Sequence, residues 1–149
     1  MKIPLAILVS YLALLIVGLA GGISKPENEH VKISISATPS ELKAGAQAQL
    51  LISLKPKKGY HIVTTPPMEI KLDSVSGIQV IGKLQIPQST NKDYVETSKP
   101  IKQRITLASR LKPGTATIKG TLTYFYCSDA EGWCSKFKQP IELTIKIVK

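Results

Sequence analysis

Apolar and polar residues alternate along most of the chain after residue 30, with the two-residue period of a β-strand. In residues 31–37, Val31, Ile33 and Ile35 share one face, and a lysine and two serines share the other. Alternation of this kind predicts a strand with one buried face. The same period predicts further strands in residues 47–56, 68–74, 77–86, 101–108, 111–127 and 139–149.

Turn-forming residues separate these segments, and no helical period follows residue 30. The longest irregular stretch is residues 87–100, bracketed by two prolines, and long loops in compact domains are often functional. Many short strands with regular turn signals predict an all-β fold, an immunoglobulin-like antiparallel β-sandwich. An antibody-type bridge between the sheets is not expected, because both cysteines and the tryptophan lie within residues 127–134.

The N-terminal segment is set apart by its composition. Residues 3–23 follow Lys2 and contain no charged side chain, which is typical of a signal peptide or a membrane anchor. Cleavage after Ala20 and retention as a spanning helix both fit, since about 20 apolar residues can cross a bilayer. In either case residues 24–30 are expected to be a linker, and residues 31–149 a single domain outside the cytoplasm, secreted or membrane-anchored. Paired cysteines are normally oxidised there.

The chain is basic, with 20 lysines and arginines against 10 acidic residues. The cations are scattered rather than clustered, and no nucleic-acid-binding motif accompanies them. We therefore expect a solvated basic surface and no nucleic-acid partner.

Cys127 and Cys134 flank a turn-like segment and are the only two cysteines of the chain. A zinc site needs about four ligands, and a blue-copper site, even with Met68 as axial ligand, needs a cluster that the sequence lacks. No metal or other cofactor is therefore expected. A structural disulfide closing so short a loop would contribute under about 3 kcal/mol. A redox-active disulfide on a surface hairpin is favoured, and the structural disulfide remains open.

The alternation through residues 114–127 predicts that Cys127 points away from the main core. Asp129 and Glu131 are expected to be turn residues that disfavour a thiolate, whereas Lys136 and Lys138 favour one at Cys134. On these grounds an incoming thiolate is expected to attack Cys127 and to expel Cys134. We expect Trp133 to shield the disulfide and His61 to be a packing residue at a strand end.

The segment "TLTYFYCSDAEGWC" resembles the cysteine hairpin of one family, the N-terminal periplasmic (alpha) domain of the transmembrane disulfide reductase DsbD. The segment "LKPKKGYHI" resembles an early strand of the same family, and the resemblance covers about residues 31–149. It implies an immunoglobulin-like fold and a thiol:disulfide oxidoreductase activity, with Cys127 and Cys134 as the redox pair.

The resemblance also implies partners and a cap. Electrons would arrive from a membrane-embedded disulfide reductase through a thioredoxin-like domain. They would leave to periplasmic disulfide isomerases and to the thioredoxin-like proteins of cytochrome c biogenesis. A cap loop would cover the disulfide, with Asp93 and Tyr94 in residues 92–96 as the matching residue types. The alternative is a non-catalytic β-sandwich that binds a protein partner and carries a structural disulfide.

Overall fold

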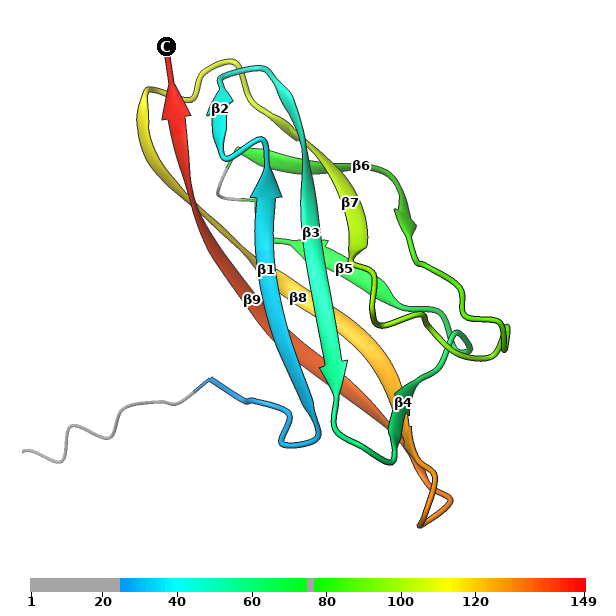
Figure 1. Ribbon diagram of the computed structural model, residues 1–149. Helices are drawn as coiled ribbons and strands as arrows, with labels where there is room; N and C mark the ends of the chain where they lie inside the picture. Colours follow the sequence, from blue (N-terminus) through cyan, green and yellow to red (C-terminus); the bar gives the residue numbers. More distant parts are fainter. Residues whose placement is uncertain (1–24, 75–76) are drawn as a thin grey trace, which may run out of the picture.

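The fold is described by a computed structural model that covers residues 25–74 and 77–149 (Figure 1). The predicted signal peptide or anchor, residues 3–23, lies outside the described residues. Within the described ranges the chain forms nine β-strands and no α-helix, which confirms the all-β prediction. The strands are β1 (Val31–Thr38), β2 (Glu41–Lys43), β3 (Gln47–Pro56), β4 (Tyr60–Ile62), β5 (Glu69–Leu72), β6 (Ile78–Gln85), β7 (Ile101–Leu107), β8 (Gly114–Ser128) and β9 (Cys134–Val148).

The strands form two sheets, seen in Figure 1 as two layers that lie one over the other. The four-stranded sheet has the order β1-β3-β7-β6, and the five-stranded sheet has the order β2-β9-β8-β4 with β5 also paired to β8. Among the described strands all pairings are antiparallel except that of β2 with β9, which is parallel. The predicted immunoglobulin-like sandwich is confirmed, and the parallel pair is its one departure from a purely antiparallel arrangement.

The core fills the space between the two sheets with every second residue of the strands. In β3, Leu50, Ile52 and Leu54 are buried while the residues between them are more exposed. Leu122 and Tyr124 of β8 approach from the other sheet and are fully buried. A strand presents alternate side chains to opposite faces, so the sequence period and the buried face coincide.

The longest element is the β8–β9 hairpin, whose two strands have 15 residues each. Their pairing runs from Gly114 opposite Ile147 to Cys127 opposite Cys134. At Gly120 the five-stranded sheet is tightly packed, since a Cβ atom there would lie 2.3 Å from the carbonyl oxygen of Lys71 in β5. The two strands of the hairpin are therefore the central strands of their sheet. The turn of the hairpin lies at the lower end of the molecule in Figure 1.

The segment expected to be a linker packs against the sandwich from Asn28 onward. Asn28 is 8% exposed, and its amide nitrogen donates a 3.0 Å hydrogen bond to the hydroxyl oxygen of Tyr124. Burial raises the pKa of Tyr124 to about 12, although the hydrogen bond from Asn28 opposes the shift. Residues 28–30 thus belong to the packed structure rather than to a free connection.

The raised pKa of Tyr124 predicts alkaline destabilisation. Between about pH 10 and 12 an unfolded chain loses the tyrosine proton while the folded chain keeps it. The free energy of unfolding should therefore fall as the pH rises through this window, by about 3 kcal/mol on completion. Urea denaturation at stepped pH values measures the fall, and Tyr124→Phe should remove this part of it. The same pH slope in both proteins would contradict the prediction.

Candidate functional site

The two cysteines form a disulfide at the last paired position of the β8–β9 hairpin. Their Cα atoms are 4.0 Å apart. The next position, Ser128 opposite Trp133, is hydrogen-bonded, with the Ser128 amide donating to the Trp133 carbonyl at 2.9 Å. Hydrogen-bonded and non-hydrogen-bonded pairs alternate along an antiparallel ladder. The cysteines therefore occupy a non-hydrogen-bonded pair, where facing side chains come closest.

The turn beyond the disulfide is held by its own main chain and by a neighbouring turn. The amide of Gly132 donates to the carbonyl of Ser128 at 3.0 Å, and Gly132 has a φ of +68°, which favours glycine. The amide of Asp129 donates to the carbonyl of Gly59 at 2.9 Å. The hairpin tip is thereby tied to the β3–β4 turn, which fixes the Asp129 side chain near β4.

The two cysteines differ in exposure. Cys127 is 6% exposed, whereas Cys134 is an exposed residue. β4 lies beside β8 and places His61 directly opposite Cys127. Cys134 lies on β9, whose other neighbour, β2, pairs only with Lys146 to Val148 at the far end. Cys127 thus has a neighbouring strand on its other side, whereas Cys134 lies at an open edge of the sheet.

The exposure of the two residues favours attack at Cys134 over the expected attack at Cys127. Cys127 does lie on the face opposite Tyr124 and Tyr126, which belong to the core. However, Cys127 is only 6% exposed there, because β4 lies beside it in the sheet and places His61 opposite it on that face. The sequence pattern could not reveal this, because β4 has only three residues and lies far away in the chain.

His61, Asp129 and Tyr94 form a small polar cluster beside the buried cysteine. The Nδ1 atom of His61 lies 2.7 Å from Oδ1 of Asp129, so that Nδ1 donates to the carboxylate. The ring centroids of His61 and Tyr94 are 3.9 Å apart. The His61 side chain is 20% exposed. An imidazole with a carboxylate on one nitrogen and an aromatic ring beside it has a fixed orientation.

The long loop that carries the predicted cap residues reaches this cluster. Tyr94 forms an isolated antiparallel bridge with Val63, and the amide of Val95 donates to the carbonyl of Ile62 at 2.9 Å. Asp93 is exposed and accepts a 2.9 Å hydrogen bond from the amide of Thr64 through its carbonyl oxygen. Tyr94 therefore lies at the site through its side chain, whereas Asp93 holds the loop in place through its main chain.

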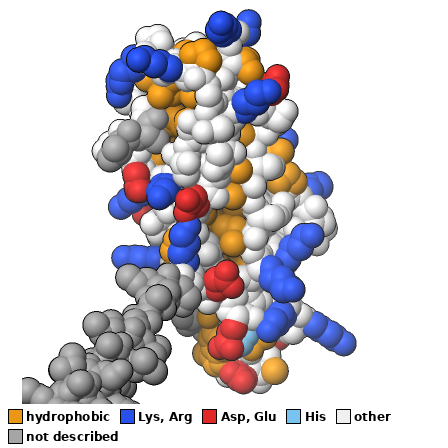
Figure 2. Space-filling model, turned by 90° about the vertical axis from the view of Figure 1, so that its left-hand side faces the viewer, with side chains coloured by type: hydrophobic (Ala, Val, Ile, Leu, Met, Phe, Trp, Pro, Cys, Tyr) orange, Lys and Arg blue, Asp and Glu red, His pale blue; other side chains and the backbone are white. Residues whose placement is uncertain are grey.

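Trp133 lies on the opposite face of the hairpin from the disulfide. It belongs to an aromatic cluster with His30, Tyr60 and Tyr126, in which the rings of His30 and Tyr60 stack 4.3 Å apart. Its indole nitrogen donates to the carboxylate of Glu131. Trp133 therefore lies on the opposite face from the disulfide that it was expected to shield. Trp133 and Glu131 order the hairpin tip, where hydrophobic side chains reach the surface beside acidic ones at the lower end of Figure 2.

His61 is the site residue whose role the sequence pattern missed. It was expected to pack at a strand end, yet it lies opposite Cys127 and binds Asp129. The available signal was the "GYHI" segment, which places a histidine directly after a tight turn. Only the pairing of β4 with β8 relates that position to the cysteines.

The accessible side of the disulfide carries one more pair of side chains. Phe125 and Lys136 face each other two residues further along the same face, with the Lys136 Nζ atom 5.9 Å from the centroid of the Phe125 ring. A partner that reaches Cys134 would therefore meet an aromatic surface and an ammonium group.

Within residues 25–74 and 77–149 no group of three or more histidines, cysteines or acidic residues is placed to hold a metal ion. In the same ranges no helix is long and apolar enough to cross a membrane. A disulfide is typical of a chain that matures in an oxidising, extracytoplasmic compartment.

No family model and no curated protein matches this chain. Among solved structures it is similar to a type I cohesin–dockerin complex from Clostridium thermocellum, with a TM-score of 0.44 and 16% identity over 78% of this chain and 99% of the other. It is also similar to the yeast GGA1 GAE domain, with a TM-score of 0.43 and 19% identity over 79% and 95% of the chains. A third structure is AggA, the major subunit of aggregative adherence fimbriae type I from Escherichia coli, with a TM-score of 0.35 and 12% identity over 84% and 99%. At these values the comparisons assign no function.

Proposed function

We propose that this chain is an extracytoplasmic thiol–disulfide exchange domain, a thiol:disulfide oxidoreductase that relays electrons through Cys127 and Cys134. The observation that carries the proposal is the asymmetry of the disulfide. Cys134 is exposed, and Cys127 is 6% exposed beside His61. Exchange requires one sulfur that a partner thiolate can reach and a second that can leave.

The reduction proceeds in two steps. A thiolate of the donor attacks the Cys134 sulfur and forms a mixed disulfide, while the electron pair of the broken bond goes to the Cys127 sulfur. The second thiolate of the donor then attacks the donor sulfur of the mixed disulfide and releases Cys134 as a thiolate. The donor leaves as a disulfide, and the domain has gained two electrons and takes up two protons.

His61 has a role in the first step. A thiolate released at Cys127 is a charge in a buried position, which is unfavourable unless it is neutralised. His61 lies directly opposite Cys127 and is oriented by the 2.7 Å contact with Asp129. We infer that His61 supplies the proton that the Cys127 sulfur accepts, while the Asp129 carboxylate holds the ring in place.

We propose as partners those that the resemblance implies. Thioredoxin-like proteins and a membrane-embedded disulfide reductase are the proposed electron donors, and periplasmic thiol proteins are the acceptors. Phe125 and Lys136 provide an apolar and a cationic contact next to Cys134. The loop that carries Tyr94 packs on His61 beside Cys127, and partners approach from the side of Cys134.

The reduction potential of the disulfide tests the proposal. Structural disulfides of secreted proteins have potentials below about −300 mV, and exchange-active ones are more oxidising. Equilibration of the folded protein with glutathione and dithiothreitol buffers, followed by thiol alkylation, should give a value above that limit. A value in the structural range would instead favour the alternative, a non-catalytic binding module with a structural disulfide.

A further inference from the structure

The strands of the four-stranded sheet contain no acidic residue. β1, β3, β6 and β7 carry five cations, namely Lys32, Lys55, Lys83, Lys102 and Arg104. The strands of the other sheet include three acids, Glu41, Glu69 and Glu142, among their lysines. The basic charge of the chain is therefore unevenly divided between two surfaces that face in opposite directions.

Four of these cations share the outer face of their sheet. Lys102 and Arg104 alternate with Ile101, Gln103 and Ile105, which are buried, so they point outward. Within the described residues none of the sheet's cations takes part in an ion pair.

Lys32 and Lys55 are exposed and lie directly opposite each other on neighbouring strands. Like charges in this position oppose strand pairing. The folded domain thus retains an unfavourable pair of charges, which a bound anionic surface would neutralise.

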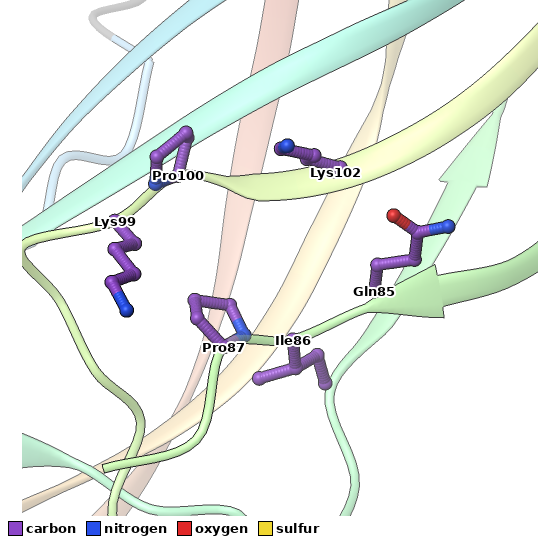
Figure 3. A pocket seen from close by; sticks show the side chains of 6 residues that line it. All are labelled: Gln85, Ile86, Pro87, Lys99, Pro100 and Lys102. Carbon is purple, nitrogen blue, oxygen red and sulfur yellow. The ribbon is translucent and has the colours of Figure 1, made fainter.

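A hollow lies at the edge of the same face (Figure 3). It has a volume of about 400 Å³ and lies between the end of β6 and the start of β7. Lys99, Lys102 and Gln85 supply polar groups, and Ile86, Pro87 and Pro100 supply apolar walls. Two ammonium groups beside an apolar wall suit a ligand in which a phosphate is joined to hydrocarbon chains, as in a phospholipid.

The N-terminal part of the sequence brings a membrane within reach of this face. Residues 3–23 are uncharged and long enough to span a bilayer. Residues 24–27 separate them from Asn28, which is packed on the sandwich, and four extended residues span at most about 14 Å. A connection of that length would keep a membrane that holds residues 3–23 close to the domain.

We propose that the outer face of the β1-β3-β7-β6 sheet docks on an anionic lipid bilayer, and that the hollow at Lys99 and Lys102 receives a phosphate headgroup. Juxtaposed lysines and arginines each contribute about 1 kcal/mol at such a surface, or about a fivefold gain in binding. The opposite sheet, which carries Cys134, then faces away from the membrane. The proposal does not rest on the redox activity and can hold without it.

Lysine labelling of the full chain tests this orientation. The protein is reconstituted into vesicles of phosphatidylcholine alone and of phosphatidylcholine and phosphatidylglycerol in equal parts. It is then acetylated with a water-soluble reagent and analysed by mass spectrometry. In the anionic vesicles the labelling of Lys32, Lys55 and Lys102 should fall at least about fivefold and recover in high salt. Lys71 and Lys138 on the other sheet should be labelled equally in both.

Two variants that lose the same number of charges distinguish binding through this face from a general effect of the net charge. One removes the face with Lys32→Ser, Lys55→Ser, Lys102→Ser and Arg104→Ser, and the other removes Lys43, Lys71, Lys138 and Lys146 from the opposite sheet in the same way. Protection of Lys99 should be lost in the first and kept in the second. Equal labelling of Lys32, Lys55 and Lys102 in both lipids overturns the proposal. Protection of Lys138 instead of these three lysines would also overturn it. Protection of Lys32, Lys55 and Lys102 by soluble polyphosphate, but not by phosphatidylglycerol vesicles, would do the same. The reduction potential is measured separately, so failure of either proposal is recognised independently.

Discussion

Cys134 should react at least about tenfold faster than Cys127 with a thioredoxin-like partner, because access of the attacking or attacked sulfur controls the rate of exchange. Cys134 is exposed at the start of β9, whereas Cys127 is 6% exposed beside β4. The measurement uses a partner without its resolving cysteine, whose remaining cysteine carries thionitrobenzoate. Attack by the free thiol of Cys127→Ser or of Cys134→Ser releases the coloured thionitrobenzoate anion and leaves the mixed disulfide.

The two single-cysteine variants serve as controls for each other, since each retains one thiol in the same fold. Cys127→Ser, which retains Cys134, should accumulate the mixed disulfide rapidly. Cys134→Ser, which retains Cys127, should accumulate it slowly. Denaturation in urea should remove the difference, because both thiols are then exposed. Faster reaction of Cys134→Ser in the folded state would restore the order of attack expected from the flanking lysines.

Substitution of His61 should slow reduction of the disulfide by about a hundredfold at neutral pH, the lower end of what a positioned proton donor contributes. In His61→Gln the sulfur leaving at Cys127 has no imidazole beside it to donate a proton. Stopped-flow reduction by a dithiol, followed through the single tryptophan at the hairpin tip, gives the rate.

The chain offers a matched control in its second histidine. His30 stacks on Tyr60 in the aromatic cluster, on the opposite face of the hairpin from the disulfide. His30→Gln should therefore leave the rate of reduction near that of the unchanged protein. Rates that fall equally in both variants would show that His61 acts only through the stability of the hairpin tip.

The proposed activity and the proposed membrane contact use different surfaces. The five-stranded sheet presents Cys134 with Phe125 and Lys136, and the four-stranded sheet presents cations without acids. Since the two sheets pack face to face, their outer faces point in opposite directions. A domain lying on its basic face would therefore keep its accessible sulfur available to soluble partners.

Local patterns in the sequence were sufficient for the fold class and for most of the strands. Alternation predicted the strands and their buried faces, as in β3 with Leu50, Ile52 and Leu54. The presence of two cysteines around a short turn led to a disulfide within one hairpin, which the structure contains. Both inferences depend on residues that are neighbours in the chain, and the period of a strand applies wherever it pairs.

The tertiary structure decided the properties of the site, because burial and contact depend on which strand lies alongside. β4 pairs alongside Cys127 and brings His61 to Asp129, although nothing near the cysteines in sequence predicts it. The loop adds Tyr94 from a third region, and residues 28–30 add His30 to the aromatic cluster. The lysines looked scattered along the chain, and only the strand order gathers Lys32, Lys55, Lys102 and Arg104 on one acid-free face. Charge and reactivity are set by neighbours in space, and the pairing of distant strands determines those neighbours.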